Sequence, residues 1–377
     1  MSATTADVII IGAGAIGSAA AYNLTKKGLS VIVLERSGYI GNGGSSRNGG
    51  GVRQSGRDPR ELPLAMYGVK NLWPSLSEEL GMDVEYYQRG NLRLGKTEEH
   101  LRILRGLTQN ANECGLDVRM IDAAEAREIC PYLSGEVIGA SWCPTDGHAN
   151  PMLVTLAFYR AARRNGARFI TGCEVTAIQK SRGRARRVVS STGEIFEADS
   201  VVLVAGYDSN AVLASLGFFV PMSPLLMEVL VTEEMPPMFY QMLGTAMADF
   251  YGHQSSHGSF VFGGSSGYEA YNRNNGTPVS SSITAPSMCR AVLGYFPALS
   301  EAKIVRTWAG WIDECADHVP VIGLTDEVPG FVFGCAFSGH GFGISPVAGM
   351  LLAELAAGET TTLDVSAFAY DRFKAKI

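Results

Sequence analysis

Three glycines near the amino terminus carry the clearest chemical signal. Gly12, Gly14 and Gly17 form a G-x-G-x-x-G pattern, completed by Ala15 and Ile16. In a strand-turn-helix unit the first glycine permits a tight turn, the second lets a pyrophosphate approach the backbone, and the third lets the helix pack on the strand. The pattern predicts a dinucleotide-binding turn.

The residues around these glycines agree with such a unit. A β-branched run at 7–11 precedes them, a helical run at 18–27 follows and stops at Gly28, and a second strand at 30–34 ends at Glu35. A carboxylate at the tip of the second strand can hold a ribose hydroxyl. Strand, helix and acid together argue against a chance turn, so we expect a βαβ unit here.

Two later glycine-rich segments bear on the choice between NAD and FAD, because FAD needs further backbone contacts. Residues 41–54 can lie along a cofactor, and a solvated loop is the alternative. Residues 338–343 lie between a predicted strand at 331–335 and a predicted helix at 344–357. The start of that helix can stabilise negative charge on a reduced flavin near N1 and O2, and a plain connector is the alternative.

The composition excludes several classes of protein. The chain has 377 residues, 46% of them hydrophobic and 18% charged, which is typical of a globular protein of about two domains. Its net charge is −6 without a Lys/Arg block, so we expect no nucleic-acid partner. Seven scattered cysteines without a C-x-x-C pair argue against a disulfide framework or a metal site. Without a basic leader or an uninterrupted apolar span, we expect a cytoplasmic protein with no transmembrane helix.

The middle of the chain predicts more of the first sheet. A helix at 151–165 and an alternating run through Val175 precede a strand at 200–204, which ends at Ala205 and Gly206. We expect a β-meander that feeds a buried parallel strand joining the first sheet. The basic cluster of this region is expected to be a solvated hairpin and comprises Arg182, Arg184, Arg186 and Arg187.

Taken together, these segments resemble the FAD-dependent amine and D-amino-acid oxidoreductases, the family that includes glycine oxidase and sarcosine oxidase. The resemblance covers nearly the whole chain. Residues 227–232 and 307–323 are most similar to the β subunits of multi-subunit sarcosine oxidase, proline dehydrogenase, hydroxyproline dehydrogenase and opine oxidase. The motifs that carry the resemblance are 8–17, 31–36, 45–53, Ala205-Gly206, 308–310 with 320–323, and 339–341 with Pro346.

The resemblance implies an α/β fold. A glutathione-reductase-type, Rossmann-like FAD-binding domain is interrupted by an antiparallel-sheet α+β substrate domain, with the flavin at their boundary. The FAD-binding domain would comprise residues 1–79, 145–215 and 325–377, and the substrate domain residues 80–144 and 216–324.

The resemblance also implies an activity. Members oxidise the C–N bond of an amino acid or secondary amine to an imine by hydride transfer to flavin N5, and here sarcosine, proline, hydroxyproline and opines are the candidate substrates. Similarity to β subunits implies a dehydrogenase acting as the catalytic subunit of a complex. Its partners would be a second flavin-containing subunit, with FMN at the subunit interface, and a small iron-sulfur subunit. The alternatives are an oxygen-using amine or amino-acid oxidase and a non-catalytic electron-relay subunit.

The cofactor-binding residues that the motifs and the resemblance imply lie in five parts of the chain. They are Gly12, Gly14, Ala15, Ile16, Gly17; Glu35, Arg36; Ser45, Ser46, Arg47, Asn48, Gly49, Gly50; Val175, Ala205, Gly206, Gly310; and Gly339, His340, Gly341, Phe342, Gly343, Ile344.

Departures from the family shape the remaining expectations. The cysteine that tethers FAD in monomeric sarcosine oxidases matches Gly310 or Trp311, so we expect noncovalent FAD. The histidine that carries covalent FMN in the four-subunit enzymes matches Pro151, which argues against a covalent FMN. The lysine that faces oxygen matches Val261, so we expect oxygen to be a poor acceptor.

Two residues are candidates for the substrate site. The lysine that binds the substrate carboxylate in monomeric sarcosine oxidases matches Gly343, so another cation must replace it. Arg53 follows the glycine loop and can grip a carboxylate bidentately, with a surface arginine as the alternative. Tyr251 matches a tyrosine that lines the substrate site of the family, with a core tyrosine as the alternative. No metal site is expected.

Overall fold

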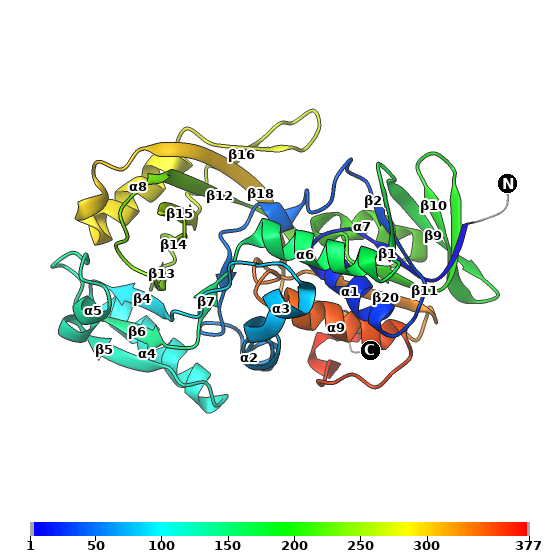
Figure 1. Ribbon diagram of the computed structural model, residues 1–377, viewed down its shortest axis with the longest axis horizontal. Helices are drawn as coiled ribbons and strands as arrows, with labels where there is room; N and C mark the ends of the chain where they lie inside the picture. The colour runs from blue at the N-terminus through cyan, green and yellow to red at the C-terminus, as the bar shows by residue number, and fades with distance from the viewer. Residues whose placement is uncertain (1–3, 375–377) are drawn as a thin grey trace.

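A parallel sheet forms the core of one lobe, on the right of Figure 1. The computed structural model describes residues 4–374. The parallel strands are β1 (Thr4–Ile11), β2 (Val31–Glu35), β8 (Arg168–Thr171), β11 (Ile195–Leu203) and β20 (Phe331–Cys335). They lie in the order β20-β11-β1-β2-β8, so the first strand of the chain is central. Val31 to Leu34 and all of β20 are buried, as expected for a sheet covered on both faces.

Antiparallel strands extend this sheet. β9 (Val175–Ser181) pairs with β10 (Arg184–Ser190), and β10 pairs with β11, so the predicted meander is confirmed. β19 (Val321–Leu324) pairs with β20. This differs from the predicted boundary, which assigned residues 321–324 to the substrate domain. The two apolar runs are joined by a short connection and satisfy each other's backbone groups, which binds β19 to the first sheet. The other predicted boundaries stay predictions.

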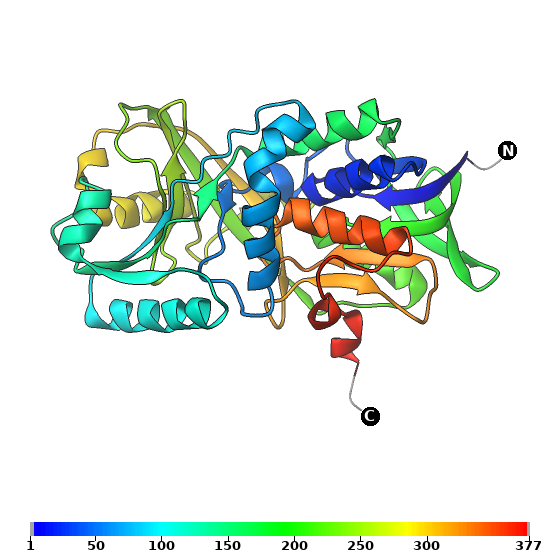
Figure 2. The same cartoon turned by 60° about the horizontal axis from the view of Figure 1, so that its bottom comes forward.

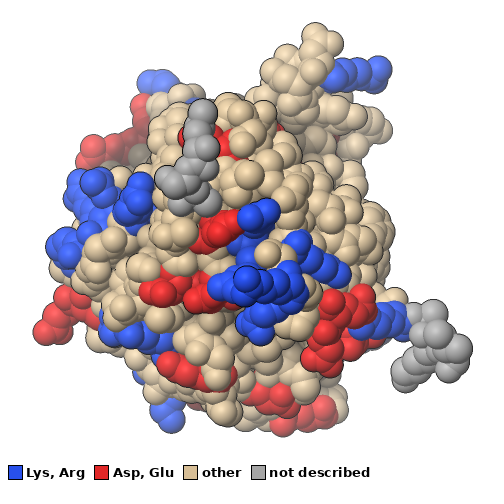
Figure 3. Space-filling view, turned by 90° about the vertical axis from the view of Figure 1, so that its right-hand side faces the viewer, with Lys and Arg blue, Asp and Glu red and all other residues tan. Residues whose placement is uncertain are grey.

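The basic hairpin β9–β10 is balanced by acidic side chains. Arg186 pairs with Asp199, and Arg187 pairs with Glu197, both on the neighbouring strand β11. Figure 3 shows basic and acidic side chains interspersed over this end of the molecule. The arrangement has the mixed charge of a solvated surface.

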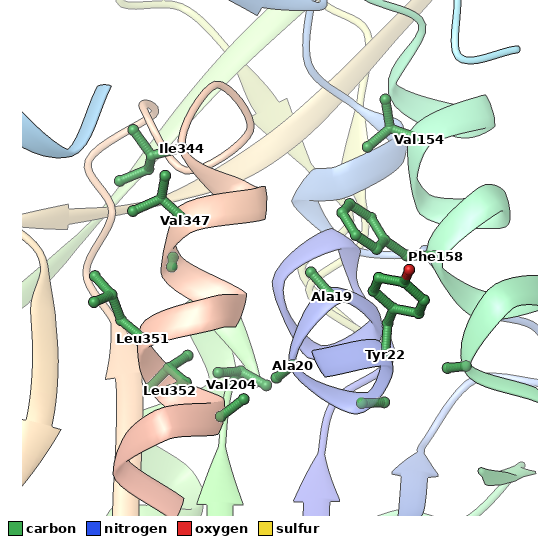
Figure 4. Close-up of a cluster of buried hydrophobic side chains, with 14 of the residues drawn as sticks. Ala19, Ala20, Tyr22, Val154, Phe158, Val204, Ile344, Val347, Leu351 and Leu352 are labelled. Atoms are coloured by element: carbon green, nitrogen blue, oxygen red, sulfur yellow. The ribbon is translucent and has the colours of Figure 1, made fainter. Parts of the chain in front are cut away.

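Three helices pack together over the parallel sheet: α1 (Ala15–Lys26), α6 (Pro151–Arg164) and α9 (Ser345–Ala356). Figure 4 shows Ala19 and Ala20 of α1 between the apolar side chains of α9 and those of α6. A Cβ placed on Gly349 of α9 would lie 2.4 Å from the Cβ of Ala19. Small residues on both helices therefore allow a close approach.

Helix α1 begins three residues before its predicted start at Ser18. The turn ends at Gly14, and Gly17 lies within the first helical turn. A Cβ on Gly17 would lie 2.0 Å from the carbonyl oxygen of Gly12, so the helix can start this early only with glycine there.

The second lobe is built on another eight-stranded sheet, on the left of Figure 1. In spatial order its strands are β18 (Ile304–Cys315), β12 (Met222–Glu234), β15 (Ser259–Gly264), β14 (Tyr251–Gln254), β13 (Met242–Thr245), β4 (Asn91–Gly95), β6 (Gly139–Cys143) and β5 (Arg119–Asp122). All neighbours are antiparallel except β13 and β4. Helices α5 (Ala123–Ile129) and α8 (Thr284–Tyr295) pack on one face, and α4 (Glu98–Glu113) packs against β4 and β6.

Shorter elements complete the fold, and Figure 2 shows α2 at the junction of the two lobes. These elements are α2 (Leu62–Asn71), α3 (Leu76–Leu80), α7 (Ser209–Leu213), and the two-stranded pairs β3 (Gly51–Val52) with β7 (Gly147–His148) and β16 (Ala270–Tyr271) with β17 (Pro278–Val279). All seven cysteines are free thiols. No helix within residues 4–374 has the length and apolar character needed to cross a membrane.

Candidate active site

The turn between β1 and α1 is shaped by its glycines. Gly12 has φ +109°, and a Cβ there would lie 2.5 Å from the carbonyl oxygen of Val204. Neither the conformation nor the space admits a side chain. The turn therefore follows the end of β11 closely and leaves the start of α1 open.

The amino terminus of α1 has the features of an anion site. Gly14 is the N-cap and supplies no side chain to the first helical N–H groups. Ser45 comes from the predicted glycine-rich segment, and its Oγ accepts a hydrogen bond from the N–H of Ala15 at 2.9 Å. Free N–H groups and the helix dipole make such a position suitable for a pyrophosphate.

Glu35 lies at the end of β2, beside the same turn. Its carboxylate accepts hydrogen bonds from the N–H groups of Ala13 and Ser37, both at 2.9 Å. This places the acid at the glycine turn, where the sequence predicted a ribose contact. Arg36 instead forms an exposed ion pair with Asp208 at 2.7 Å, two residues after Gly206.

The two glycine-rich segments meet each other. A Cβ on Gly343 would lie 3.1 Å from the carbonyl oxygen of Gly51 and 2.8 Å from a guanidinium nitrogen of Arg57. A Cβ on Gly341 would lie 3.6 Å from Ile16, in the first turn of α1. The predicted segments 12–17, 41–54 and 338–343 are thus parts of one region.

The second sheet contacts the same region through glycines. A Cβ on Gly310 would lie 2.7 Å from the Cβ of Arg47, and one on Gly339 would lie 3.4 Å from Ile312. Gly310 and Ile312 share one face of β18, by alternation along a strand. This face therefore meets both glycine-rich loops of the other lobe.

Tyr251 and Arg53, the predicted substrate residues, lie close together. A Cβ on Gly49 would lie 2.7 Å from the Tyr251 ring, and one on Gly263 would lie 2.5 Å from it, so the ring lies between two glycines. Burial raises the pKa of Tyr251, and the nearby charge of Arg53 opposes this shift. Burial also lowers the pKa of Arg53, and within residues 4–374 its guanidinium has no hydrogen-bond or ion-pair partner.

A buried carboxylate that the sequence did not predict supports both loops. Glu61 is fully buried, pairs with Arg57, and lies 3.1 Å from Nδ1 of His340. Arg57 also donates to the carbonyl oxygen of Arg53 at 2.6 Å and to that of His340 at 3.2 Å. Although burial opposes it, the charge of Arg57 and the hydrogen bond with His340 hold the pKa of Glu61 low. Its only sequence signal is the i,i+4 spacing to Arg57.

Arg93 is a second residue that the sequence did not predict. A Cβ on Gly56 would lie 2.6 Å from the central carbon of its guanidinium, so the group lies against the loop that carries Arg53. Burial, and then the charge of Arg53, lower the pKa of Arg93 to about 10. Strand alternation puts Arg93 on one face of β4 and its apolar neighbours Leu92 and Leu94 on the other. This alternation is the only signal of Arg93 in the sequence.

Other predicted residues lie farther from Arg53 or inside the cores. The side chain of Val175 packs in the core beneath the meander, and Ile344 is buried at the start of α9. Phe342 contacts the ring of Trp73, whose indole N–H donates to the carbonyl oxygen of Gly343 at 2.9 Å. Their backbone contacts to a cofactor stay predictions, as do those of Ser46, Asn48, Gly50 and Ala205.

Two buried histidines stack near the site. The rings of His148 and His253 have centroids 3.9 Å apart. Burial lowers the pKa of His148 to about 4. Burial also lowers the pKa of His253, and repulsion from His148 lowers it further. His257 instead pairs with Glu85 at the surface, 3.0 Å away. Residues 4–374 contain no cluster of three or more potential metal ligands.

Comparison with known proteins decides the family. The model of the family described as FAD dependent oxidoreductase matches residues 7–355. The chain belongs to this family. The chain is therefore an FAD-dependent oxidoreductase, and its relatives include amine and amino-acid oxidases and dehydrogenases.

Relatives of this FAD-dependent oxidoreductase match along nearly its whole length. The beta chain of sarcosine oxidase from Rhodobacter capsulatus is 29% identical over 98% of this chain and 88% of that protein. An opine oxidase subunit of Rhizobium meliloti is 26% identical over 98% of both chains. The crystal structure of L-proline dehydrogenase from P. horikoshii has a TM-score of 0.89 at 29% identity, covering 99% of this chain and 98% of that one. The predicted resemblance and fold are confirmed.

The residues present fit the FAD that the family uses. The uncapped start of α1, with Ser45 beside it, suits the pyrophosphate, and the carboxylate of Glu35 suits a ribose. The glycines at 49–51 and 339–343 keep side chains away from the place where the loops meet. This is the arrangement that an extended dinucleotide needs.

Proposed function

We propose that the chain is an FAD-dependent dehydrogenase that oxidises the C–N bond of an amino acid or secondary amine to an imine. The observation that supports this best is the guanidinium of Arg53. It is partly buried next to Tyr251, where the glycine-rich loops meet, and it has no hydrogen-bond or ion-pair partner within residues 4–374. An unpaired charge in such a position is costly, which favours a bound carboxylate as its partner.

The side chains can position such a substrate. Arg53 would grip the carboxylate with two parallel hydrogen bonds, and the Tyr251 hydroxyl would orient the carboxylate or the amine. Gly49 and Gly263 flank the tyrosine ring so closely that a Cβ on either would clash with it, which fixes the position of the ring. The substrate would thereby lose its rotational freedom before reaction, which is the main contribution that this chemistry requires of the protein.

The reaction balances without a protein nucleophile. The carbon next to the neutral amine nitrogen loses a hydride, the nitrogen lone pair forms the C=N bond, and a proton leaves the nitrogen. When bound, FAD supplies the hydride acceptor at N5. Water then hydrolyses the imine. The residues that would hold FAD are those of the turn at 12–17, Glu35, Ser45 and the loop at 338–344.

Glu61 would position the two loops relative to each other. Its carboxylate ties Arg57, which holds the backbone of Arg53, to the ring of His340. We assign His340 a role through its backbone and its place in the loop. The positive end of α9, which follows directly, would favour negative charge nearby.

We further propose that the chain is the catalytic β-type member of a complex. Two relatives are themselves subunits, one of sarcosine oxidase and one of opine oxidase, which supports a subunit role. The partner would carry a second flavin, with FMN at the interface, and a small iron-sulfur subunit would take electrons onward. A cytoplasmic location agrees with reduced cysteines.

Anaerobic substrate titration tests the proposal. The purified holoprotein is mixed with sarcosine, proline, hydroxyproline, an opine, iminodiacetate and simple amino acids of both hands, and flavin absorbance is followed. We expect at least one amine to bleach the flavin, and an artificial acceptor to restore it. A flavin that dithionite reduces but no amine bleaches would favour the electron-relay alternative instead.

A further inference from the structure

We propose that Arg53 and Arg93 form a two-carboxylate site, so that the substrate is an amine flanked by two carboxylates. The proposal rests on the proposed function for the chemistry, but the binding site itself stands on geometry. It names a second anchor, Arg93, and a narrower substrate class than amino acids in general.

Strand register places Arg93 in line with Tyr251. Arg93 pairs with Gly244 on β13, Gly244 pairs with Tyr251 on β14, and Tyr251 pairs with Gly263 on β15. Lateral partners share a face of the sheet, and the opposite face is the apolar one that carries Leu92, Leu243 and Phe262. The row therefore faces the glycine-rich loops of the other lobe.

The two guanidiniums occupy different positions in this site. Two strand spacings separate Arg93 from Tyr251, a distance of about 10 Å. Gly244 lies between them, and a Cβ there would lie 3.6 Å from the Cγ of Arg93. Along the facing loop, Arg53 lies beside Gly51, whereas Arg93 lies against Gly56. One small carboxylate next to Tyr251 would leave Arg93 without a partner.

A buried carboxylate that acts on both arginines already has other hydrogen-bond partners. Asp146 is fully buried and accepts from the N–H of Gln54 at 2.7 Å, from the hydroxyl of Ser55 at 2.5 Å, and from Asn91 at 3.4 Å. Its charge raises the pKa of both arginines, but among the hydrogen bonds and ion pairs of residues 4–374 it bonds to neither. Within residues 4–374, Arg93, like Arg53, has no hydrogen-bond or ion-pair partner.

Since neither arginine has an ion-pair partner within residues 4–374, the carboxylates of a ligand would be their partners. Each guanidinium can grip one carboxylate bidentately, and their mutual repulsion makes a dianionic ligand more favourable than a monoanionic one. A ligand that spans the row would place its central amine between the two carboxylates. Iminodiacetate and N-(carboxyalkyl) amino acids have this form, whereas sarcosine and proline lack the second carboxylate.

Binding of two unreactive analogues tests the site without turnover. Thiodiacetate has sulfur in place of the amine and two carboxylates, and methylthioacetate is its counterpart with one. Dissociation constants for the holoprotein are measured by calorimetry and by perturbation of the flavin spectrum. We expect thiodiacetate to bind about 10- to 150-fold more tightly, as one added charged hydrogen-bonded contact implies.

Substitutions of Arg93 test whether this difference in affinity depends on its guanidinium. Arg93→Met should abolish the preference for thiodiacetate while leaving methylthioacetate binding and FAD content unchanged, and Arg93→Gln provides a second, polar replacement. Arg163→Met, at an exposed position of α6, is the matched control. Equal affinities in the unaltered protein, or an equal loss for both analogues in Arg93→Met, would overturn the two-carboxylate site.

Catalysis is scored separately. The same proteins are reduced anaerobically with iminodiacetate and sarcosine, and iminodiacetate should have the higher kcat/KM only while Arg93 is present. If no amine reduces the flavin yet thiodiacetate is preferred, the proposed function fails and the binding site stands. If sarcosine reduces the flavin as efficiently as iminodiacetate and neither analogue is preferred, the function stands and the second site fails.

Discussion

At the scale of single residues, we expect substrate binding to depend most on the side chain of Arg53. Arg53→Lys keeps the charge but loses the planar pair of donors. We expect kcat/KM to fall about 10- to 150-fold, since one charged hydrogen bond is lost, while flavin content stays unchanged. Steady-state kinetics with an artificial acceptor measure this. Arg163→Lys on the surface is the control, and unaltered kinetics in Arg53→Lys would rule out carboxylate binding by Arg53.

The stacked histidines make stability depend on pH. Burial lowers the pKa of His148 to about 4. As the pH falls below about 6.5, the unfolded chain therefore binds a proton at this histidine, whereas the folded chain does not. His148 thus lowers the free energy of unfolding as pH falls, by roughly 2 kcal/mol between pH 6.5 and pH 5. Urea denaturation at both pH values should show a smaller decrease for His148→Phe than for the unaltered protein. His257→Phe, at the surface, should retain the full decrease.

At the scale of elements, the close contact of α1 and α9 depends on a missing side chain. Gly349→Ala would force a Cβ to within 2.4 Å of Ala19, and such overpacking costs about 1 to 3 kcal/mol. Gly106→Ala in the exposed middle of α4 meets no atom within 4 Å and should stabilise by up to about 1 kcal/mol. In urea denaturation we expect Gly349→Ala to lower the free energy of unfolding and Gly106→Ala to raise it. Stabilisation by both changes would show that the helices can separate freely.

The elements nearest the amino terminus could be predicted because their signals are local. The glycine turn, Glu35 and the strand periods each specify a βαβ unit without reference to the rest of the chain. Arg93 and Glu61 could not be predicted. Alternation shows which face of β4 carries Arg93, but only the packing of the lobes decides what that face meets. In the sequence, Arg57 and Glu61 have the i,i+4 spacing of an ordinary surface ion pair. Only the fold shows that the loop at 338–344 covers Glu61.

At the scale of the whole molecule, the cofactor should be held without a covalent bond. The sequence match puts Gly310 or Trp311 at the position of the tethering cysteine, and a Cβ on Gly310 would lie 2.7 Å from the Cβ of Arg47. Acid precipitation should therefore release FAD into the supernatant, where its absorbance is measured. A yellow pellet would contradict this expectation, and a colourless native protein would contradict FAD binding.

The assembly should pass electrons to a partner in preference to oxygen. Val261, at the place of an oxygen-activating lysine, pairs with His253, two residues along β14 from Tyr251, so no flexible cation occupies that position. In stopped-flow experiments the substrate-reduced chain should be reoxidised faster by an artificial quinone than by air-saturated buffer. Reoxidation by oxygen fast enough to sustain turnover would make the chain an oxidase that needs no partner.

The long strand pair β12 and β18 is part of the second sheet, and it also contacts the parallel-sheet lobe. Their register runs from Met222 opposite Cys315 to Thr232 opposite Ile304, while Gly310 and Ile312 contact the loops of the parallel-sheet lobe. Amide hydrogens along this ladder should exchange together, as those of one cooperative unit do. Opening of the antiparallel lobe would pull β18 away from the glycine-rich loops. Partial unfolding and cofactor escape are then the same event, and bound FAD would slow the exchange of amides on β12, a strand that the cofactor need never touch.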